Sequence, residues 1–212
     1  MTHPRRTRIK FCGMTSPGDV ELAVEAGADA VGVILAESAR RVSLDELPAI
    51  AAAIPLFVAR IGVLADQGGR EANALRALGF TLQFNGDESP SDCDALAGGT
   101  PYIKAFHVGP MDREIDLEQC GAYANAFWMF DSRVPALRGG TGVAFDWHLV
   151  EPVSEAHRIV ISGGLNPDNI GVCVRRVRPF AVDVRSGIET AGAKDPEKMR
   201  AFVRTVRAAD AS

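Results

Sequence analysis

Short apolar runs alternate along the chain with longer amphipathic segments. Each of the eight apolar runs ends near a Gly, Ser, Asn or Asp, and most are nearly continuous rather than strictly alternating. Such runs are typical of parallel strands that are buried on both faces. We therefore predict strands at Arg8–Cys12, Ala30–Leu35, Phe57–Leu64, Thr81–Phe84, Tyr102–His107, Phe127–Phe130, Arg158–Ser162 and Ala181–Val184.

The segments between the runs have helical spacing and helix-capping signals. Ser43 followed by Glu46 has the pattern of a capping box. Asn166-Pro167 and Asp195-Pro196 each place a capping residue before a proline. We predict helices at Asp19–Ala26, Leu44–Ala53, Arg70–Leu78, Pro90–Ala97, Arg113–Ala124, Trp147–Ala156, Asp168–Val177 and Glu197–Arg207.

Eight strand–helix units fill the 212 residues, and no Pro/Ser/Gly-rich linker divides them. We therefore expect one domain over residues 1–212, folded as a closed (β/α)₈ barrel, the TIM barrel of the α/β class. An open doubly wound sheet is the alternative. Such a sheet usually has fewer strands and a GxGxxG first turn, whereas the first turn here is Cys12-Gly13-Met14-Thr15.

Composition narrows the classes of partner and the compartment. The net charge is −4 and aromatics make up 7%, which argues against a nucleic-acid partner. No apolar run is long enough to span a membrane, and Gly13 and Pro17 interrupt the segment after the basic start, so we expect no signal peptide. The cysteines form no CxxC pair, which predicts neither a zinc site nor a disulfide scaffold and favours a reducing, cytoplasmic compartment; they are Cys12, Cys93, Cys120 and Cys173.

The carboxyl ends of the predicted strands supply the candidate chemistry, because functional residues of such barrels gather there. Cys12 ends the first strand, where a thiolate can act as base or nucleophile. The simpler interpretation is that Cys12 is a small buried core residue. Asp131 follows a buried strand, where desolvation would raise its pKa and suit a general acid; a loop cap is equally compatible. His107 ends the fifth strand, and we interpret it as peripheral or structural.

Two glycine-containing turns follow the seventh and eighth strands. Gly163-Gly164 precedes the cap at Asn166, and Ser186-Gly187 follows the last strand. Exposed backbone N–H groups at these adjacent loops predict a phosphate site, although one such pair alone would indicate only a tight turn. Arg40, after the second strand, could hold a carboxylate through a bidentate pair or simply be a surface charge.

The order and spacing of several motifs resemble the phosphoribosylanthranilate isomerase family of tryptophan biosynthesis. The matches extend from Lys10 to about Phe202. They comprise Lys10-Phe11-Cys12-Gly13-Met14-Thr15, Ala26-Gly27-Ala28-Asp29, Gly139-Gly140-Thr141-Gly142, Phe145-Asp146-Trp147, Gly163-Gly164-Leu165-Asn166-Pro167, Val182-Asp183-Val184, Ser186-Gly187-Ile188-Glu189 and Lys194-Asp195. Each motif is weak alone, but the set is specific.

The resemblance implies an Amadori rearrangement of N-(5-phosphoribosyl)anthranilate. It implies Cys12 as general base and Asp131 as general acid, with no metal and no cofactor. It also implies substrate contacts from Arg40, Asn85 and Asp183, and phosphate binding by Gly163, Gly164, Ser186 and Gly187. The implied partner is a small phosphorylated substrate, and we expect a monomer or a homodimer.

Three positions depart from the family pattern. Asn85 stands where the family usually has a histidine, and an amide can donate a hydrogen bond but cannot carry a proton charge. Ala39 replaces a proline that would stiffen its loop, and Arg185 replaces a Ser or Asn beside the phosphate loop. These changes affect expected efficiency and substrate range.

Two other function classes stay open at this point. A different barrel enzyme on a phosphorylated substrate, such as a synthase, an epimerase or another sugar-phosphate isomerase, often uses paired aspartates or a lysine, whereas Cys12 argues against an aspartate pair. A non-catalytic binding barrel would require a decayed site, yet Cys12, Arg40, Asp131 and Asp183 are all present.

Overall fold

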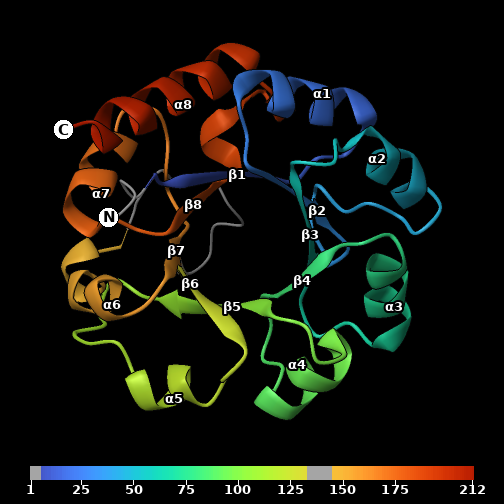
Figure 1. Cartoon of the computed structure of the whole chain (residues 1–212), viewed down its shortest axis with the longest axis horizontal. Helices are drawn as coiled ribbons and strands as arrows, with labels where there is room; N and C mark the ends of the chain where they lie inside the picture. The colour runs from blue at the N-terminus through green and yellow to red at the C-terminus, as the bar shows by residue number, and fades with distance from the viewer. Residues whose placement is uncertain (1–5, 133–144) are drawn as a thin grey trace.

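The strands close into a parallel barrel in the order of the chain (Figure 1). A computed structural model describes residues 6–132 and 145–212. The closed (β/α)₈ barrel is confirmed, and the open sheet is excluded because β1 pairs with both β2 and β8. The strands are β1 (Arg8–Cys12), β2 (Ala30–Ile34), β3 (Ala59–Leu64), β4 (Thr81–Phe84), β5 (Tyr102–Val108), β6 (Ala126–Ser132), β7 (Ile159–Ile161) and β8 (Ala181–Val184).

Helices surround the barrel in Figure 1 and bury one face of each against it. In the last helix, α8, the buried residues Met199, Phe202, Val206 and Ala209 recur at helical spacing, and Asp195 caps its first turn. The helices are α1 (Pro17–Ala26), α2 (Leu47–Ala53), α3 (Gly69–Ala77), α4 (Pro90–Ala97), α5 (Leu117–Gly121), α6 (Glu151–Ala156), α7 (Ile170–Val177) and α8 (Pro196–Asp210), with the 3₁₀ turns η1 (Trp147–Leu149) and η2 (Ser186–Ile188).

Several predicted boundaries were wrong, each for a local reason. The capping-box contacts form, since Glu46 Oε2 accepts from the Ser43 N–H at 2.9 Å and Ser43 Oγ accepts from the Glu46 N–H at 3.4 Å. The helix nevertheless begins at Leu47, because Pro48 has no N–H and suits only a first turn. α5 is shorter than predicted because Asp116 caps it by accepting from the Gln119 N–H.

One strand boundary that differs from its prediction lies at Phe57. The predicted third strand included this residue, but β3 begins at Ala59, and the Phe57 side chain is 95% exposed. Its aromatic character resembles that of a buried strand residue, so hydrophobicity alone misplaced it. The neighbouring Leu56 is 89% exposed, which makes this loop an apolar projection between α2 and β3.

Alternation along the strands separates two packed layers. One set of alternate residues packs between the barrel and the helices. The other set faces the barrel interior, where small apolar clusters such as Ala105, Met129 and Val160 fill the middle. Charged and polar side chains on interior positions, including Lys10 and Asp183, are therefore buried inside the barrel.

After β8 the chain forms a short hairpin that the hydrophobic pattern did not predict. Its strands are β9 (Glu189–Thr190) and β10 (Ala193–Lys194), and Glu189 pairs with Lys194. Two-residue strands carry no detectable periodicity. Among the described segments, no helix is long and apolar enough to cross a membrane.

Candidate functional site

Cys12 lies at the carboxyl end of β1 and faces the barrel interior together with Lys10. Cys12 is 5% exposed. Lys10 Nζ lies 2.8 Å from Asp183 Oδ1, and the two residues are register partners across β1 and β8. Sequence reasoning did not single out Lys10 as a site residue, although a lysine in an otherwise apolar inner strand was a usable signal, because such a charge is rarely buried without a partner.

Two opposing effects set the protonation of Cys12. Burial raises the pKa of the Cys12 thiol above its ordinary value, whereas the positive charge and hydrogen bond of Lys10 act to lower it, and Asp183 adds to the rise. For Lys10, burial alone would lower the pKa, but attraction to Asp183 and Cys12 outweighs burial and raises it. Lys10 therefore stays charged beside the thiol and stabilises its thiolate form.

Gly32 makes room for this pair on the adjacent strand. Gly32 is the register partner of Cys12 across β1 and β2. A Cβ atom at this position would lie 2.8 Å from Cys12 Sγ and 3.1 Å from Lys10 Nζ. A side chain here would displace the thiol or the ammonium group, so the glycine is part of the geometry of the site.

Asp131 lies near the end of β6, beside His107 of β5, its register partner. Burial raises the pKa of the Asp131 carboxyl; His107 opposes the rise, and the nearby Asp183 carboxylate adds to it. A Cβ on Gly163, at φ 84°, would lie 2.6 Å from Asp131 Oδ1, so the loop after β7 passes directly over this carboxyl group. The arrangement suits a carboxylic acid that keeps its proton to higher pH than a free aspartate does.

Asp183 connects the Cys12 and Asp131 sides of the mouth. Its Oδ1 accepts from Lys10 and its Oδ2 accepts from Ser162 Oγ at 3.4 Å. The side chain is buried, and both of its oxygens have protein partners. Its charge acts on both Cys12 and Asp131, whereas a direct substrate contact from Asp183 stays a prediction.

Arg40 lies at the mouth in a two-pronged ion pair with Glu189 of the β9–β10 hairpin. Arg40 Nη2 donates to Glu189 Oε2 at 2.9 Å and Nε donates to Oε1 at 3.2 Å. The side chain is thus held in place by the protein rather than free in solvent. Glu189 and its other partner, Lys194, were part of matching motifs, but sequence reasoning assigned them no role.

The two predicted phosphate loops lie against each other. A Cβ on Gly187 would lie 1.9 Å from the Leu165 carbonyl oxygen, so only glycine allows this approach. Gly163 and Gly164 have φ of 84° and 65°, and their N–H groups have no backbone partner among the described residues. Ser186 begins η2 beside them. These loops offer the backbone N–H groups that an anion requires.

The corner after β4 carries Asn85. Asn85 Oδ1 accepts from Gln83 Nε2 at 2.7 Å, and His107 Nε2 lies 3.1 Å from the Asn85 carbonyl oxygen. The amide nitrogen of Asn85 is the group left to meet a substrate. His107 is exposed, contacts the Asn85 backbone and is the register partner of Asp131, and its interpretation as a peripheral or structural residue stays a prediction.

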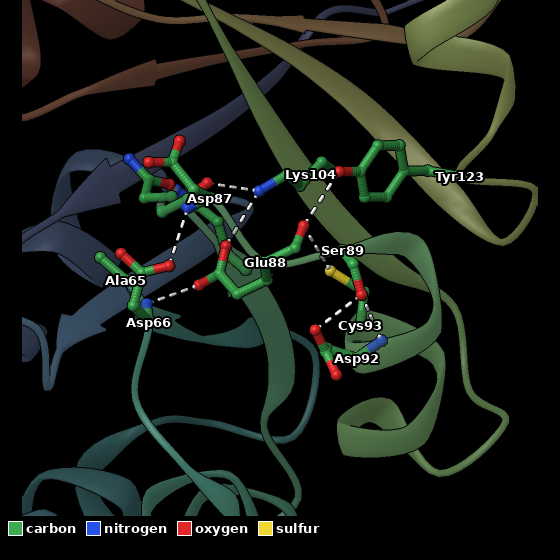
Figure 2. Close-up of polar contacts among 12 residues, drawn as sticks. Ala65, Asp66, Asp87, Glu88, Ser89, Asp92, Cys93, Lys104 and Tyr123 are labelled. Atoms are coloured by element: carbon green, nitrogen blue, oxygen red, sulfur yellow. Dashed lines mark hydrogen bonds and ion pairs between the residues drawn. The ribbon is translucent and has the colours of Figure 1, made fainter.

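A buried ion pair supports this corner from the outer side of the barrel wall (Figure 2). Lys104 Nζ lies 2.9 Å from Glu88 Oε2 and donates to the Gly86 carbonyl oxygen at 2.6 Å, while Glu88 Oε1 accepts from the Asp66 N–H. The Tyr123 hydroxyl donates to the Glu88 carbonyl oxygen. These contacts tie the loops after β3 and β4 to β5.

Two further sequence predictions concern the region around residue 140 and metal binding. The Gly139-Gly140-Thr141-Gly142 motif lies outside the described residues. In the neighbouring Phe145-Asp146-Trp147 segment, Asp146 caps η1. Within residues 6–132 and 145–212, no group of three or more His, Cys, Asp or Glu side chains is arranged to hold a metal ion.

The chain matches known proteins over nearly its whole length. A model of the family N-(5′-phosphoribosyl)anthranilate (PRA) isomerase matches residues 9–205. The N-(5′-phosphoribosyl)anthranilate isomerase of Thiobacillus denitrificans is 42% identical over 207 residues, covering 95% of this chain and 98% of that protein. The Pseudomonas putida F1 protein of the same name is 44% identical, with 95% and 98% coverage.

Solved structures of the same enzyme share the architecture. Phosphoribosyl anthranilate isomerase from Thermotoga maritima superposes with a TM-score of 0.85 at 33% identity, covering 95% of this chain and 99% of that one. A structure in complex with reduced 1-(o-carboxyphenylamino)-1-deoxyribulose 5-phosphate has a TM-score of 0.82 at 32% identity, with the same coverage. A third, described as monomers generated from the dimeric Thermotoga maritima enzyme, has a TM-score of 0.81 at 30% identity, again with 95% and 99% coverage.

Proposed function

The chain belongs to the phosphoribosylanthranilate isomerase family, and from this premise we propose that Cys12 and Asp131 perform its reaction as general base and general acid. The reaction is the isomerisation of N-(5′-phosphoribosyl)anthranilate to 1-(2-carboxyphenylamino)-1-deoxyribulose 5-phosphate in tryptophan biosynthesis. The observation that supports the two roles is their placement: Cys12 is buried and Asp131 is partly buried at the carboxyl end of the barrel, where active sites of this fold form.

The proposed chemistry moves protons without adding or removing atoms. Asp131, protonated, donates its proton to the furanose ring oxygen as the C1′–O bond breaks and the nitrogen lone pair forms a Schiff base. Cys12, as thiolate, then removes the C2′ proton, and the C–H electron pair moves toward the nitrogen to give an enolamine. Loss of the proton from the 2′-hydroxyl and gain of a proton at C1′ complete the ketone. The substrate's own nitrogen is the electron sink.

The substrate has two anionic groups, a carboxylate and a phosphate, and the barrel mouth has two regions that suit anions, one cationic and one rich in backbone N–H groups. We propose that Arg40 receives the anthranilate carboxylate and that Gly163, Gly164, Ser186 and Gly187 bind the phosphate. The amide of Asn85 supplies a single neutral hydrogen bond where relatives usually have an imidazole. Asp183 holds the charged Lys10 beside Cys12, and a direct contact between Asp183 and the substrate is part of this proposal.

The experiment that tests this function is a fluorescence assay with purified protein. The anthranilate adduct is generated in solution and its fluorescence decay is followed with and without the protein. Enzyme-dependent decay, with the deoxyribulose phosphate product identified by chromatography, is the expected result. Protein that is folded by circular dichroism but does not accelerate the decay contradicts the proposal.

We also propose a cytoplasmic protein, a single domain and a homodimer. Four free cysteines are compatible with a reducing compartment. Exposed Leu56 and Phe57 form the apolar projection between α2 and β3, and such side chains are unfavourable in water. A monomer is the alternative, and light scattering after size exclusion separates the two. If Leu56 and Phe57 form the interface, Phe57→Glu converts the dimer to a monomer.

A further inference from the structure

A continuous set of polar contacts links Arg40 to the strand end that carries Cys12. Glu189 is at its centre, since it pairs with Arg40 through both carboxylate oxygens. Glu189 Oε1 also accepts from Lys194 Nζ at 2.8 Å. Lys194 Nζ in turn donates to the Cys12 backbone carbonyl oxygen at 2.7 Å. One carboxylate therefore bridges the proposed carboxylate-binding residue and the proposed base.

Burial makes these contacts strong. The side chains of Arg40, Glu189 and Lys194 are 22%, 10% and 2% exposed, so water weakens the interactions little. Burial alone would raise the pKa of Glu189, but hydrogen bonds from Arg40 and Lys194 outweigh burial and lower it. Burial lowers the pKa of Lys194, and Glu189 opposes that shift. Glu189 is ionised at neutral pH.

The hairpin backbone holds Glu189 in place independently of Arg40. Glu189 and Lys194 are register partners on β9 and β10. The Glu189 carbonyl oxygen accepts from Lys198 Nζ at 2.8 Å, and the Asp195 N–H donates to the Ile188 carbonyl oxygen at 2.9 Å. The carboxylate is thus presented from a braced element, as positioning requires.

The pairing with Glu189 leaves part of Arg40 available. Glu189 engages the Nε and Nη2 side of the guanidinium, and one Nη1 N–H reaches the Ala39 carbonyl oxygen at 3.3 Å. The guanidinium has five N–H donors in a fixed fork, so the edge between Nη1 and Nη2 can still meet a second carboxylate. Arg40, Glu189 and Lys194 together carry a net charge of +1, which attracts an anionic group.

We propose that Glu189 is a positioning residue for the isomerisation: it orients Arg40 to receive the substrate carboxylate and, through Lys194, braces the end of β1 that carries Cys12. This inference rests on the proposed roles of Arg40 and Cys12. The alternative, which we call a latch, is that Glu189 competes with the substrate carboxylate for Arg40. When the charge of Glu189 is removed, positioning predicts a higher KM and a latch predicts a lower KM.

The test compares Glu189→Gln with wild type and with Glu25→Gln, a control whose exposed side chain lies near the end of α1. The positioning role predicts that Glu189→Gln raises KM about tenfold, the loss of one charge-assisted pair, and lowers kcat less. Its Kd for reduced 1-(o-carboxyphenylamino)-1-deoxyribulose 5-phosphate, measured by calorimetry, should rise by the same factor. The control should leave KM and Kd unchanged. Equal melting temperatures and circular dichroism for all variants establish that they fold.

A double-mutant cycle with Arg40→Ala identifies the route of the effect. If Glu189 acts through Arg40, adding Glu189→Gln to Arg40→Ala raises KM by less than twofold. A lower KM or a lower Kd in Glu189→Gln overturns positioning in favour of the latch, and full additivity of the two changes overturns the route through Arg40. Failure of the function itself is separate, because it appears as absence of turnover in wild-type protein.

Discussion

Lys10 Nζ and Asp183 Oδ1 lie 2.8 Å apart where β1 and β8 close the barrel, and the two side chains are 4% and 7% exposed. Two charges this deeply buried are stable only together. The ammonium group also lies beside the Cys12 thiol. The closure of the barrel and the protonation of the proposed base therefore depend on the same lysine.

We predict that Lys10→Met destabilises the protein and makes the Cys12 thiol harder to ionise. Removing one partner of a buried pair costs about 3–5 kcal/mol, because Asp183 is left without its counter-charge. Loss of the positive charge raises the pKa of Cys12, so its reaction with iodoacetamide shifts to higher pH. Urea unfolding and the pH dependence of alkylation measure the two effects.

Lys104→Met is the matched control for that prediction. Lys104 and Glu88 form a buried pair, each 4% exposed, but on the outer side of the barrel wall (Figure 2). Its loss should cost a similar free energy of unfolding, about 3–5 kcal/mol, without moving the alkylation profile of Cys12. An equal shift of that profile in both variants would mean that the Lys10 effect reflects general destabilisation.

The acid and base variants should separate chemistry from folding. Cys12→Ser and Asp131→Asn should each lower kcat by at least about 10²-fold, since general acid or base catalysis contributes that much. Cys173→Ala, in α7, is the control: burial raises the pKa of Cys173 to about 12, and it lies in a helix outside the barrel. Full turnover in either active-site variant, measured by adduct fluorescence, contradicts the assigned role.

The pH profile of kcat/KM should be bell-shaped. Its acid limb should report the pKa of the general acid, Asp131, and its alkaline limb the pKa of the general base, Cys12, which is the reverse of the usual assignment. The ordinary pKa of a thiol, about 8.5, lies well above the ~3.9 of an aspartate, and burial raises both here. The reactive form, Cys12 thiolate with Asp131 protonated, is then a minority at every pH. The population of this form is constant at pH values between the two pKa values. It decreases as the pH falls below the pKa of Asp131, and it decreases as the pH rises above the pKa of Cys12.

The direct check of this assignment is the alkaline limb. Lys10→Met raises the pKa of Cys12, so the descending limb should move to higher pH together with the alkylation profile, while the plateau becomes lower. Movement of the acid limb instead would assign that limb to Cys12 and reverse the interpretation. Measurements in buffers of constant ionic strength avoid changes in screening.

The strand ends were predictable because they follow from local pattern. β1, β4 and β8 have the predicted bounds, since each is an apolar run closed by a turn residue. Once the barrel is assumed, the rule that strand ends carry the site places Cys12 and Asp131 among the candidates, and the family resemblance supplies their proposed roles. That step needs no knowledge of contacts between distant residues.

The partners of the site residues could not be predicted in this way. Lys10 and Asp183 are 173 positions apart and meet only because the barrel closes. Arg40 meets Glu189 across 149 positions through a hairpin of two-residue strands. Such contacts depend on register and side-chain length, which hydrophobic periodicity does not encode. Phe57 shows that hydrophobicity can also mislead: its aromatic side chain predicted the start of a strand, but the residue is exposed in the loop before β3.

Gly32→Ala should impair catalysis through a single methyl group. Its Cβ would lie 2.8 Å from Cys12 Sγ and 3.1 Å from Lys10 Nζ, and both groups are held by the packed interior, so the thiol must leave its position. Because an ångström of displacement at a reacting group costs about 10²-fold, kcat should fall by that order, while KM changes less because Arg40 and the phosphate loops are untouched.

Gly62→Ala provides the comparison for this last prediction. A Cβ on Gly62 would lie 2.5 Å from the end of the Leu75 side chain, on the helix-facing side of β3. Overpacking there costs about 1–3 kcal/mol of stability but leaves the barrel mouth unchanged, so kcat below the melting temperature should be that of wild type. If Gly32→Ala and Gly62→Ala lower kcat equally, the close approach of Gly32 to Cys12 has no part in catalysis.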